Sequence, residues 1–390
     1  MSMQKNLYVI MSDGHVNFVK DFMVKKNKIK QFFIEKYLDS LLSNSKALKI
    51  NAQSKIVIFS DLHIGRRNRK DDFLNNSSMF MHLLEHYYLP CGYTLILNGD
   101  IEELQRNSFY KVREKWPDLY ALFNKFDSEE RLYKITGNHD IELYKYKDNI
   151  NDINSKIFEA MILDFEGNSI LVFHGHQASM SFILGTALVK YGLRYIAQPL
   201  GIKNFTRSYN NPRIHKVEQF VYDFSSKRKI ISIIGHTHRP LFESLSEVDL
   251  LRYKIERLLR VYPEKNSDDP KIVKKIESTI EDEIRKHKEQ IKKIYEENNE
   301  YRFKSSLYDH EFVIPSIFNS GSVIGKKGFT AIEISDNNIS LVHYFDSRKK
   351  VKNYSYSEER ITQIEDTSYY KTVLKEDSLS YIFRRIKFLA

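Results

Sequence analysis

The feature that most constrains this chain is a series of short apolar runs that each end in polar side chains. Five such runs follow one another: KIVIFSD (55–61), TLILNGD (94–100), RLYKITGNHD (131–140), SILVFHGH (169–176) and KIISIIGHTH (229–238). Short aliphatic and β-branched runs, with helical stretches between them, are typical of parallel strands buried on both faces. The sequence therefore predicts an α/β fold with most of these strands in the core.

The side chains at the ends of these runs are Asp, Asn and His. Ligands of open α/β sheets bind at the carboxyl ends of the strands, so we expect these side chains to gather at one edge. Buried polar groups without partners are costly, and a bound metal would remove that cost. Oxygen and nitrogen donors without a thiolate favour manganese, iron or zinc in a hydrolytic site over a structural zinc.

The spacing indicates two ions rather than one. In D-x-H (61–63) and H-x-H (236–238), alternation would turn both side chains of each pair to the same side of the chain. A carboxylate with two oxygens, such as Asp100, can bridge two neighbouring ions. We therefore expect two divalent metal ions, with manganese favoured and iron or zinc as alternatives.

The ordered set D-x-H, G-D (99–100), G-N-H-D (137–140), His174 and G-H-x-H (235–238) resembles the calcineurin-like metallophosphoesterases. FNSGS (318–322), together with the strands after it, resembles the closing segment of that family. The resemblance implies a four-layer α/β/β/α sandwich, in which two mixed sheets are flanked by helices, with helical insertions.

The resemblance also implies a role for each strand-end residue. The implied metal ligands are Asp61, His63 and His238 for one ion, Asn138, His174 and His236 for the other, and Asp100 as the bridge between them. His139 would protonate the leaving oxygen or stabilise the transition state, and Asp140 would orient its ring. The implied enzyme is a metal-dependent phosphoric ester hydrolase that attacks a phosphodiester or diphosphate bond with metal-activated hydroxide.

The substrate is left open between several branches of the family. GDIEEL and GNHD lack the arginine of the protein Ser/Thr phosphatases, so we disfavour that branch. GDIEE, HGHQ, GHTHRP and the insert after the fourth run resemble the branch of the UDP-2,3-diacylglucosamine pyrophosphatases, which implies a lipid-linked or nucleotide diphosphate. A nuclease or nucleotide phosphodiesterase resembling the double-strand-break repair nucleases is the second candidate. A catalytically silent scaffold, as in the retromer subunit of this fold, is the third.

Charge distribution points to an anionic partner. The chain carries a net charge of +10, and residues 177–230 contain nine Lys or Arg against two acidic residues. Arginines suit bidentate phosphate binding, and the four that we expect to contact substrate are Arg66, Arg67, Arg194 and Arg207. A phosphorylated small molecule or lipid-linked substrate is the favoured partner, and nucleic acid is the alternative.

Domain organisation follows from these patterns. We expect residues 1–50 to form a strand and a helix packed on the core, residues 51–350 to form the catalytic domain, and residues 351–390 to form a C-terminal extension. Within the domain we expect a basic helical cap insert at 177–228 and a charged helical hairpin at 243–305.

The amphipathic tail predicts either a helix docked on the domain or a membrane-surface helix. Its apolar face comprises Leu379, Ile382, Phe383, Ile386 and Leu389. A single cysteine fits a reducing compartment, and we find neither a secretory signal nor an apolar run long enough to span a bilayer. We expect a cytoplasmic protein with peripheral membrane contact as an alternative, and the oligomeric state stays open.

Overall fold

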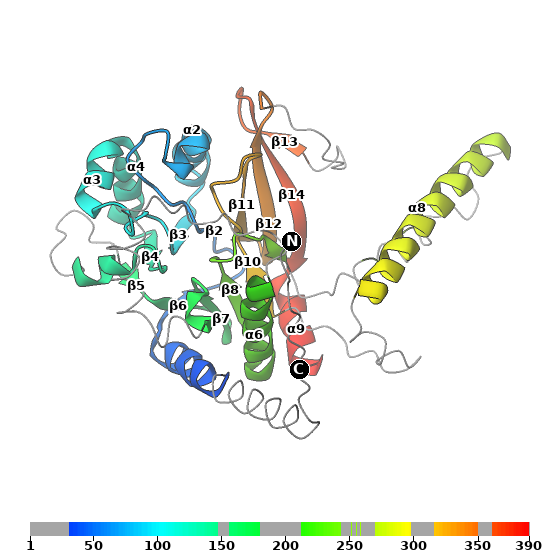
Figure 1. The fold of residues 1–390 in the computed structure, drawn as a ribbon, viewed down its shortest axis with the longest axis horizontal. Helices are drawn as coiled ribbons and strands as arrows, with labels where there is room; N and C mark the ends of the chain where they lie inside the picture. The colour runs from blue at the N-terminus through cyan, green and yellow to red at the C-terminus, as the bar shows by residue number, and fades with distance from the viewer. Residues whose placement is uncertain are drawn as a thin grey trace, which may run out of the picture.

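Two mixed β-sheets pack face to face in the computed structural model (Figure 1). The structure describes residues 31–146, 156–179, 212–242, 251, 255, 258, 270–297, 316–349 and 361–389. The eight-stranded sheet contains, in spatial order, β13 (Ile361–Gln363), β14 (Tyr369–Ser378), β12 (Asn338–Asp346), β11 (Phe329–Ser335), β2 (Ile56–Phe59), β3 (Thr94–Asn98), β4 (Leu132–Ile135) and β5 (Lys156–Phe158). The six-stranded sheet contains β1 (Lys46–Ile50), β6 (Ala160–Phe165), β7 (Asn168–Phe173), β8 (Ile231–Ile234), β10 (Ile317–Asn319) and β9 (Leu241–Phe242).

The five predicted strands are confirmed as β2, β3, β4, β7 and β8. β2, β3 and β4 are parallel neighbours, and so are β7 and β8 in the other sheet. The two sets of strand ends meet, because the Asn98 side chain at the end of β3 donates a hydrogen bond to the carbonyl of Phe173 at the end of β7 (3.1 Å). The fold therefore brings all five polar strand ends to one place.

The closing strands divide between the two sheets instead of completing one of them. β10 pairs in parallel with β8, whereas β11 pairs antiparallel with β2 and with β12. The short strands β1, β5, β6, β9 and β13 and the long strand β14 were not predicted. β6 and β7 form a hairpin around Glu166 and Gly167, both of which have positive φ.

Three buried clusters define four layers, as predicted from the family resemblance. One cluster lies between the sheets and includes Ile58, Ile96, Val172 and Ile233. A second covers the outer face of the eight-stranded sheet with α2 (Ser77–His82), the π-helix η2 (Leu83–Tyr88), α3 (Phe109–Lys115) and α4 (Pro117–Ser128). A third covers the outer face of the six-stranded sheet with the helix at 31–44 and α6 (Pro212–Arg228). Short 3-10 helices are η1 (Asp72–Asn75), η3 (Ile141–Tyr146) and η4 (His176–Ala178).

The tail forms α9 (Leu379–Leu389), and four side chains of its apolar face are buried. Leu379, Ile382, Phe383 and Ile386 join the cluster between the sheets, and the Phe383 ring stacks on Phe165 of β6. Of the two structures predicted for the tail, the structure shows the helix docked on the domain. The same apolar face is not available to a membrane surface, and none of the helices in the described ranges is long and apolar enough to cross a bilayer.

The two predicted inserts are described only in part. Residues 180–211 of the cap insert lie outside the described residues, and α6 forms its last part. The second helix of the predicted hairpin is α8 (Pro270–Glu297), which extends away from the two sheets (Figure 1). Of the first hairpin helix, only Leu251, Ile255 and Leu258 are described, and they are helical. The predicted strand near the N-terminus also lies outside the described residues.

The docking of α9 predicts unequal costs for two substitutions in it. Ile382→Ala should lower the free energy of unfolding by about 2–5 kcal/mol, because this fully buried side chain would leave a cavity between the sheets. Phe388→Ala, at a side chain that is 75% exposed, should change it by less than about 0.5 kcal/mol. Urea unfolding measures both, and equal effects would show that α9 does not contribute to the core.

Candidate metal centre

Five of the predicted metal ligands have left-handed backbone conformations. The φ angles are 54° at Asp61, 48° at His63, 52° at Asp100, 62° at His236 and 57° at His238. A non-glycine residue in this region costs on the order of 1 kcal/mol and persists only where its surroundings fix it. Such residues cluster at functional sites, so this concentration marks the strand ends as a site independently of the sequence motifs.

Glycines beside these residues allow a close approach of the segments. A Cβ on Gly137 would lie 2.1 Å from Asp100 Oδ1, and a Cβ on Gly99 would lie 2.5 Å from the His174 ring. Gly99 also has a φ of +83°, which other residues rarely adopt. Both positions therefore require glycine for the ligand-bearing segments to meet.

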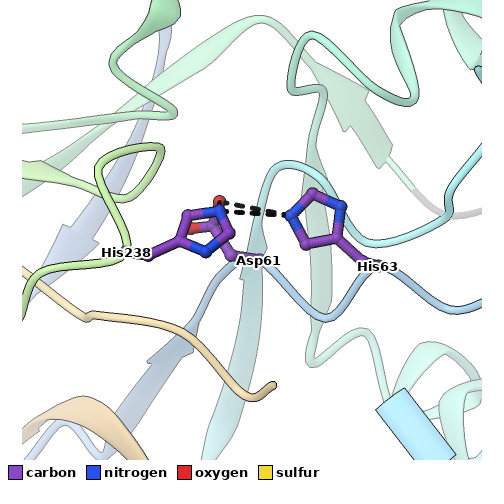
Figure 2. Close-up of side chains that lie close together, drawn as sticks. All are labelled: Asp61, His63 and His238. Atoms are coloured by element: carbon purple, nitrogen blue, oxygen red, sulfur yellow. Dashed lines mark hydrogen bonds and ion pairs between the residues drawn. The ribbon is translucent and has the colours of Figure 1, made fainter. Parts of the chain in front are cut away.

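Asp61, His63 and His238 form the first cluster of candidate ligands (Figure 2). Asp61 Oδ1 lies 3.0 Å from His238 Nε2 and 3.8 Å from His63 Nε2, and the two Nε2 atoms are 3.2 Å apart. The sequence argument placed Asp61 and His63 on the same side by strand alternation. The structure places them there through two left-handed residues beyond the end of β2.

Asp100, His174 and His236 form the second cluster. The carbonyl of Asn98 accepts a hydrogen bond from His174 Nδ1 (2.9 Å), which leaves His174 Nε2 directed at Asp100 Oδ2 (3.2 Å). Asp100 Oδ2 is also 3.9 Å from His63 Nε2 of the first cluster. Asp100 therefore lies between the two clusters, at the position expected of a bridging ligand.

The residues present fit a bound cation. Among the described residues, Asn138 Oδ1 is a buried atom without a hydrogen bond. Asp61 Oδ1 and His174 Nε2 are buried too, and the polar atoms near them belong to other candidate ligands, His238 Nε2 at 3.0 Å and Asp100 Oδ2 at 3.2 Å. Buried polar atoms in proteins are almost always paired, and all three are atom types that coordinate metals. Asn138 belongs to the segment after β4 that also carries His139, whose amide donates a hydrogen bond to Asp100 Oδ1 (2.8 Å).

The charges in the two clusters stabilise one another. Burial by itself would lower the pKa of His174, but the negative charges of Asp100 and Asp61 outweigh it and raise the pKa to about 9. Burial also opposes ionisation of Asp100, yet His174 and His139 hold its pKa well below the usual range. A divalent cation would take over the role that the imidazolium charge plays here, since it stabilises the same carboxylates.

The ring of His139 has its hydrogen-bond partner in Glu103, whereas the Asp140 carboxylate, which we predicted to orient that ring, contacts backbone amides. Glu103 Oε2 lies 2.9 Å from His139 Nδ1 and 3.4 Å from His63 Nδ1. The Asp140 carboxylate instead accepts hydrogen bonds from the amides of Gly137 and Ile101, each at 2.6 Å. Asp140 thus fixes the backbone of the site, because two amides occupy its oxygens.

Glu103 was missed as a site residue, although the sequence contains a signal for it. It stands three positions after Asp100 in GDIEE, a spacing that was used only to choose a branch of the family. Burial raises the pKa of Glu103, but His139 and His63 lower it to about 2. The carboxylate is therefore ionised, and it hydrogen-bonds to the His139 ring and lies 3.4 Å from the His63 ring nitrogen.

The structure describes two of the four arginines that we predicted to contact substrate. Arg67 pairs with Asp118 (2.7 Å), and its guanidinium lies over the Trp116 ring, 4.3 Å from the centroid. It therefore holds the loop after His63 against α4. Arg66 is exposed in the same loop. Arg194 and Arg207 lie outside the described residues.

His176, the second histidine of HGH, is packed rather than directed at solvent. Its ring lies 5.5 Å from the His174 ring and 6.2 Å from the His236 ring, measured between centroids. Burial and the neighbouring His174 lower its pKa to about 3, so the ring is neutral. It packs beside the rings of both histidines of the second cluster.

Comparison with known proteins shows which family this chain belongs to. The family model described as calcineurin-like phosphoesterase matches residues 54–263, which include every motif from Asp61 to His238. The chain belongs to the calcineurin-like phosphoesterase family. No curated protein sequence matches it.

Two solved structures are similar to this calcineurin-like phosphoesterase. Vacuolar protein sorting 29 from Cryptosporidium parvum shares 12% identity, with a TM-score of 0.33, over 83% of this chain and 98% of that one. A conserved uncharacterised protein from Streptococcus pneumoniae, described as a predicted phosphoesterase, shares 12% identity, with a TM-score of 0.25, over 75% of this chain and 89% of that one.

The raised pKa of His174 predicts pH-dependent metal binding. A cation must displace the proton on His174 below pH about 9, so Mn²⁺ affinity should rise with pH up to that value and binding should release protons. Calorimetric titration of metal-stripped protein in two buffers of different ionisation enthalpy measures both. His86→Ala, at an exposed histidine, is the control that should change neither. An affinity independent of pH, without proton release, would contradict the assignment of His174.

Proposed function

We propose that this chain is a metal-dependent phosphoric ester hydrolase with two divalent ions. The observation that carries the proposal is the position of Asp100, within 4 Å of ring nitrogens from both histidine clusters. One ion would be held by Asp61, His63 and His238, and the other by Asn138, His174 and His236. Asp100 would contact both. The donor set of oxygen and nitrogen suits manganese, with iron or zinc as alternatives.

When bound, the ions would supply Lewis-acid activation of water and of the phosphoryl oxygens. The protein would supply the remaining catalytic group through His139, which is partly exposed at the site and held by Glu103. Burial lowers the pKa of His139, but Asp100 and Glu103 raise it to about 9, so it carries a proton at neutral pH. A protonated imidazole can donate that proton from Nε2 to the leaving oxygen.

Removal of the Glu103 charge should weaken this proton donation. Glu103→Gln should lower kcat about 10–100-fold, because the ring of His139 would lose its anionic partner. His139→Ala should lower kcat about 10²–10⁴-fold. Steady-state rates of the purified variants give both values. If Glu103→Gln retained the wild-type kcat, its contact with His139 would have no part in the reaction.

For the substrate we favour a phosphodiester or diphosphate bond in a lipid-linked or nucleotide diphosphate, with Arg66 as a phosphate contact. Support comes from the net charge of +10 and from the exposed position of Arg66 in the loop after His63. The single cysteine, which is exposed and unpaired, supports a cytoplasmic location.

Hydrolysis of bis-p-nitrophenyl phosphate and p-nitrophenyl phosphate by metal-stripped protein, with and without Mn²⁺, tests the proposal. We expect Mn²⁺-dependent cleavage of the diester that His236→Ala and His139→Ala both reduce. Absence of metal binding and of turnover would overturn the proposal in favour of the scaffold alternative. Once diester cleavage is found, a steep salt dependence of nucleic-acid binding would favour a nuclease over the lipid-linked substrate.

A further inference from the structure

The turn Gly235–Arg239 carries one candidate ligand for each ion and is strained at both of them. His236 belongs to the cluster with Asp100 and His174, whereas His238 belongs to the cluster with Asp61 and His63. Both histidines have left-handed φ angles, each of which costs on the order of 1 kcal/mol. Both residues lie beyond the end of β8, and neither is a glycine, which would adopt this conformation without strain. Neighbouring side chains must therefore hold the turn.

Two side chains, from β10 and α6, hold the turn through Thr237. Asn319 of β10 donates hydrogen bonds from Nδ2 to the Gly235 carbonyl (3.0 Å) and to Thr237 Oγ1 (2.8 Å). Glu218 of α6 accepts a hydrogen bond from the same hydroxyl through Oε1 (2.9 Å). Because the hydroxyl accepts from one partner and donates to the other, its rotation is fixed, and so is the residue between the two histidines.

Glu218 also holds the residue after His238. Its Oε1 accepts a hydrogen bond from Arg239 Nε (3.2 Å), and its Oε2 pairs with a terminal guanidinium nitrogen of Arg239. Glu218 is 4% exposed and Thr237 is 3% exposed, so the carboxylate acts in a poorly solvated place. A buried carboxylate needs such a partner, and Arg239 supplies its countercharge.

We propose that Glu218 is a positioning residue of the metal centre, which holds His236 and His238 in the strained turn that directs them to separate ions. The inference rests on the two-ion function proposed above. It also means that α6, the last part of the predicted cap insert, is tied directly to the turn that bears the ligands.

Glu218 is not needed to attach α6 to the sheet. Val221 and Phe224 bury the helix against the six-stranded sheet, and Ser225 Oγ donates a hydrogen bond to Ser232 Oγ of β8 (2.7 Å). Within the described part of the chain, the Glu218 side chain hydrogen-bonds to Thr237 and Arg239. Loss of the carboxylate should therefore affect the turn more than the docking of the helix.

Metal affinity separates positioning from general stability. We expect Glu218→Ala and Thr237→Val to weaken Mn²⁺ binding about 10–100-fold at both sites, because the supporting contacts of both ligands are lost. Thr237→Ser keeps the hydroxyl and should bind nearly as the wild type does. Ser225→Ala removes a buried contact of the same helix away from the turn, so it should lower stability without changing metal affinity.

Calorimetry of the metal-stripped full-length variants gives the affinities and stoichiometry, and thermal unfolding without metal gives the stabilities. If the wild type binds two ions and Thr237→Val and Glu218→Ala bind them equally tightly, the positioning role is wrong while the proposed function stands. A wild type that binds no metal would overturn both. Thr237→Val keeps the volume of the side chain, so it answers the question even if Glu218→Ala fails to fold.

Discussion

The strained strand ends are the constraint on which the rest of this structure depends. Left-handed residues cannot hydrogen-bond as a regular strand, yet the segments that carry them pair with each other beyond the strands. The amides of Asp61 and His63 donate to the carbonyls of Gly99 and Asp100, at 3.0 and 2.9 Å. The rigid parallel sheet fixes where the segments start, and these bonds fix where they turn. Asp61, His63 and Asp100 therefore converge because the neighbouring strands β2 and β3 end in register.

Most of this arrangement could be predicted from the sequence because the strands are fully buried. Most side chains on both faces of β2, β3, β4 and β8 are apolar, which makes each strand visible as a short apolar run, with Lys134 and Ser232 as buried polar exceptions in β4 and β8. β1 and β13, by contrast, expose many of their side chains and give no such run. The division of β10 and β11 between sheets could not be predicted either, since it depends on the path of the loop after Asn319 and not on the strands.

Residue roles were less predictable than residue positions. The identity of the seven candidate ligands is implied by the family resemblance, but the direction of a side chain after a left-handed residue is not. Asp140 stands next to His139 in the chain and contacts amides, whereas Glu103, 36 positions away, contacts the ring. Arg67 is of a residue type that often binds phosphate, but its guanidinium contacts protein groups. It pairs with Asp118 of α4 and lies over the ring of Trp116, the residue just before that helix.

Burial of charge alone would not have identified the site. Glu333 of β11 is also buried, but its carboxylate accepts hydrogen bonds from the hydroxyls of Tyr88 and Tyr344 (2.7 and 2.6 Å) and pairs with Lys371 (2.6 Å). Every charge there is compensated within the protein, which is typical of a structural network. At the strand ends, Asp61, Asn138 and His174 each retain a buried atom without a hydrogen bond among the described residues. These atoms converge from separate strands, and the polar atoms near Asp61 Oδ1 and His174 Nε2 belong to other candidate ligands, which is the arrangement expected of a metal site.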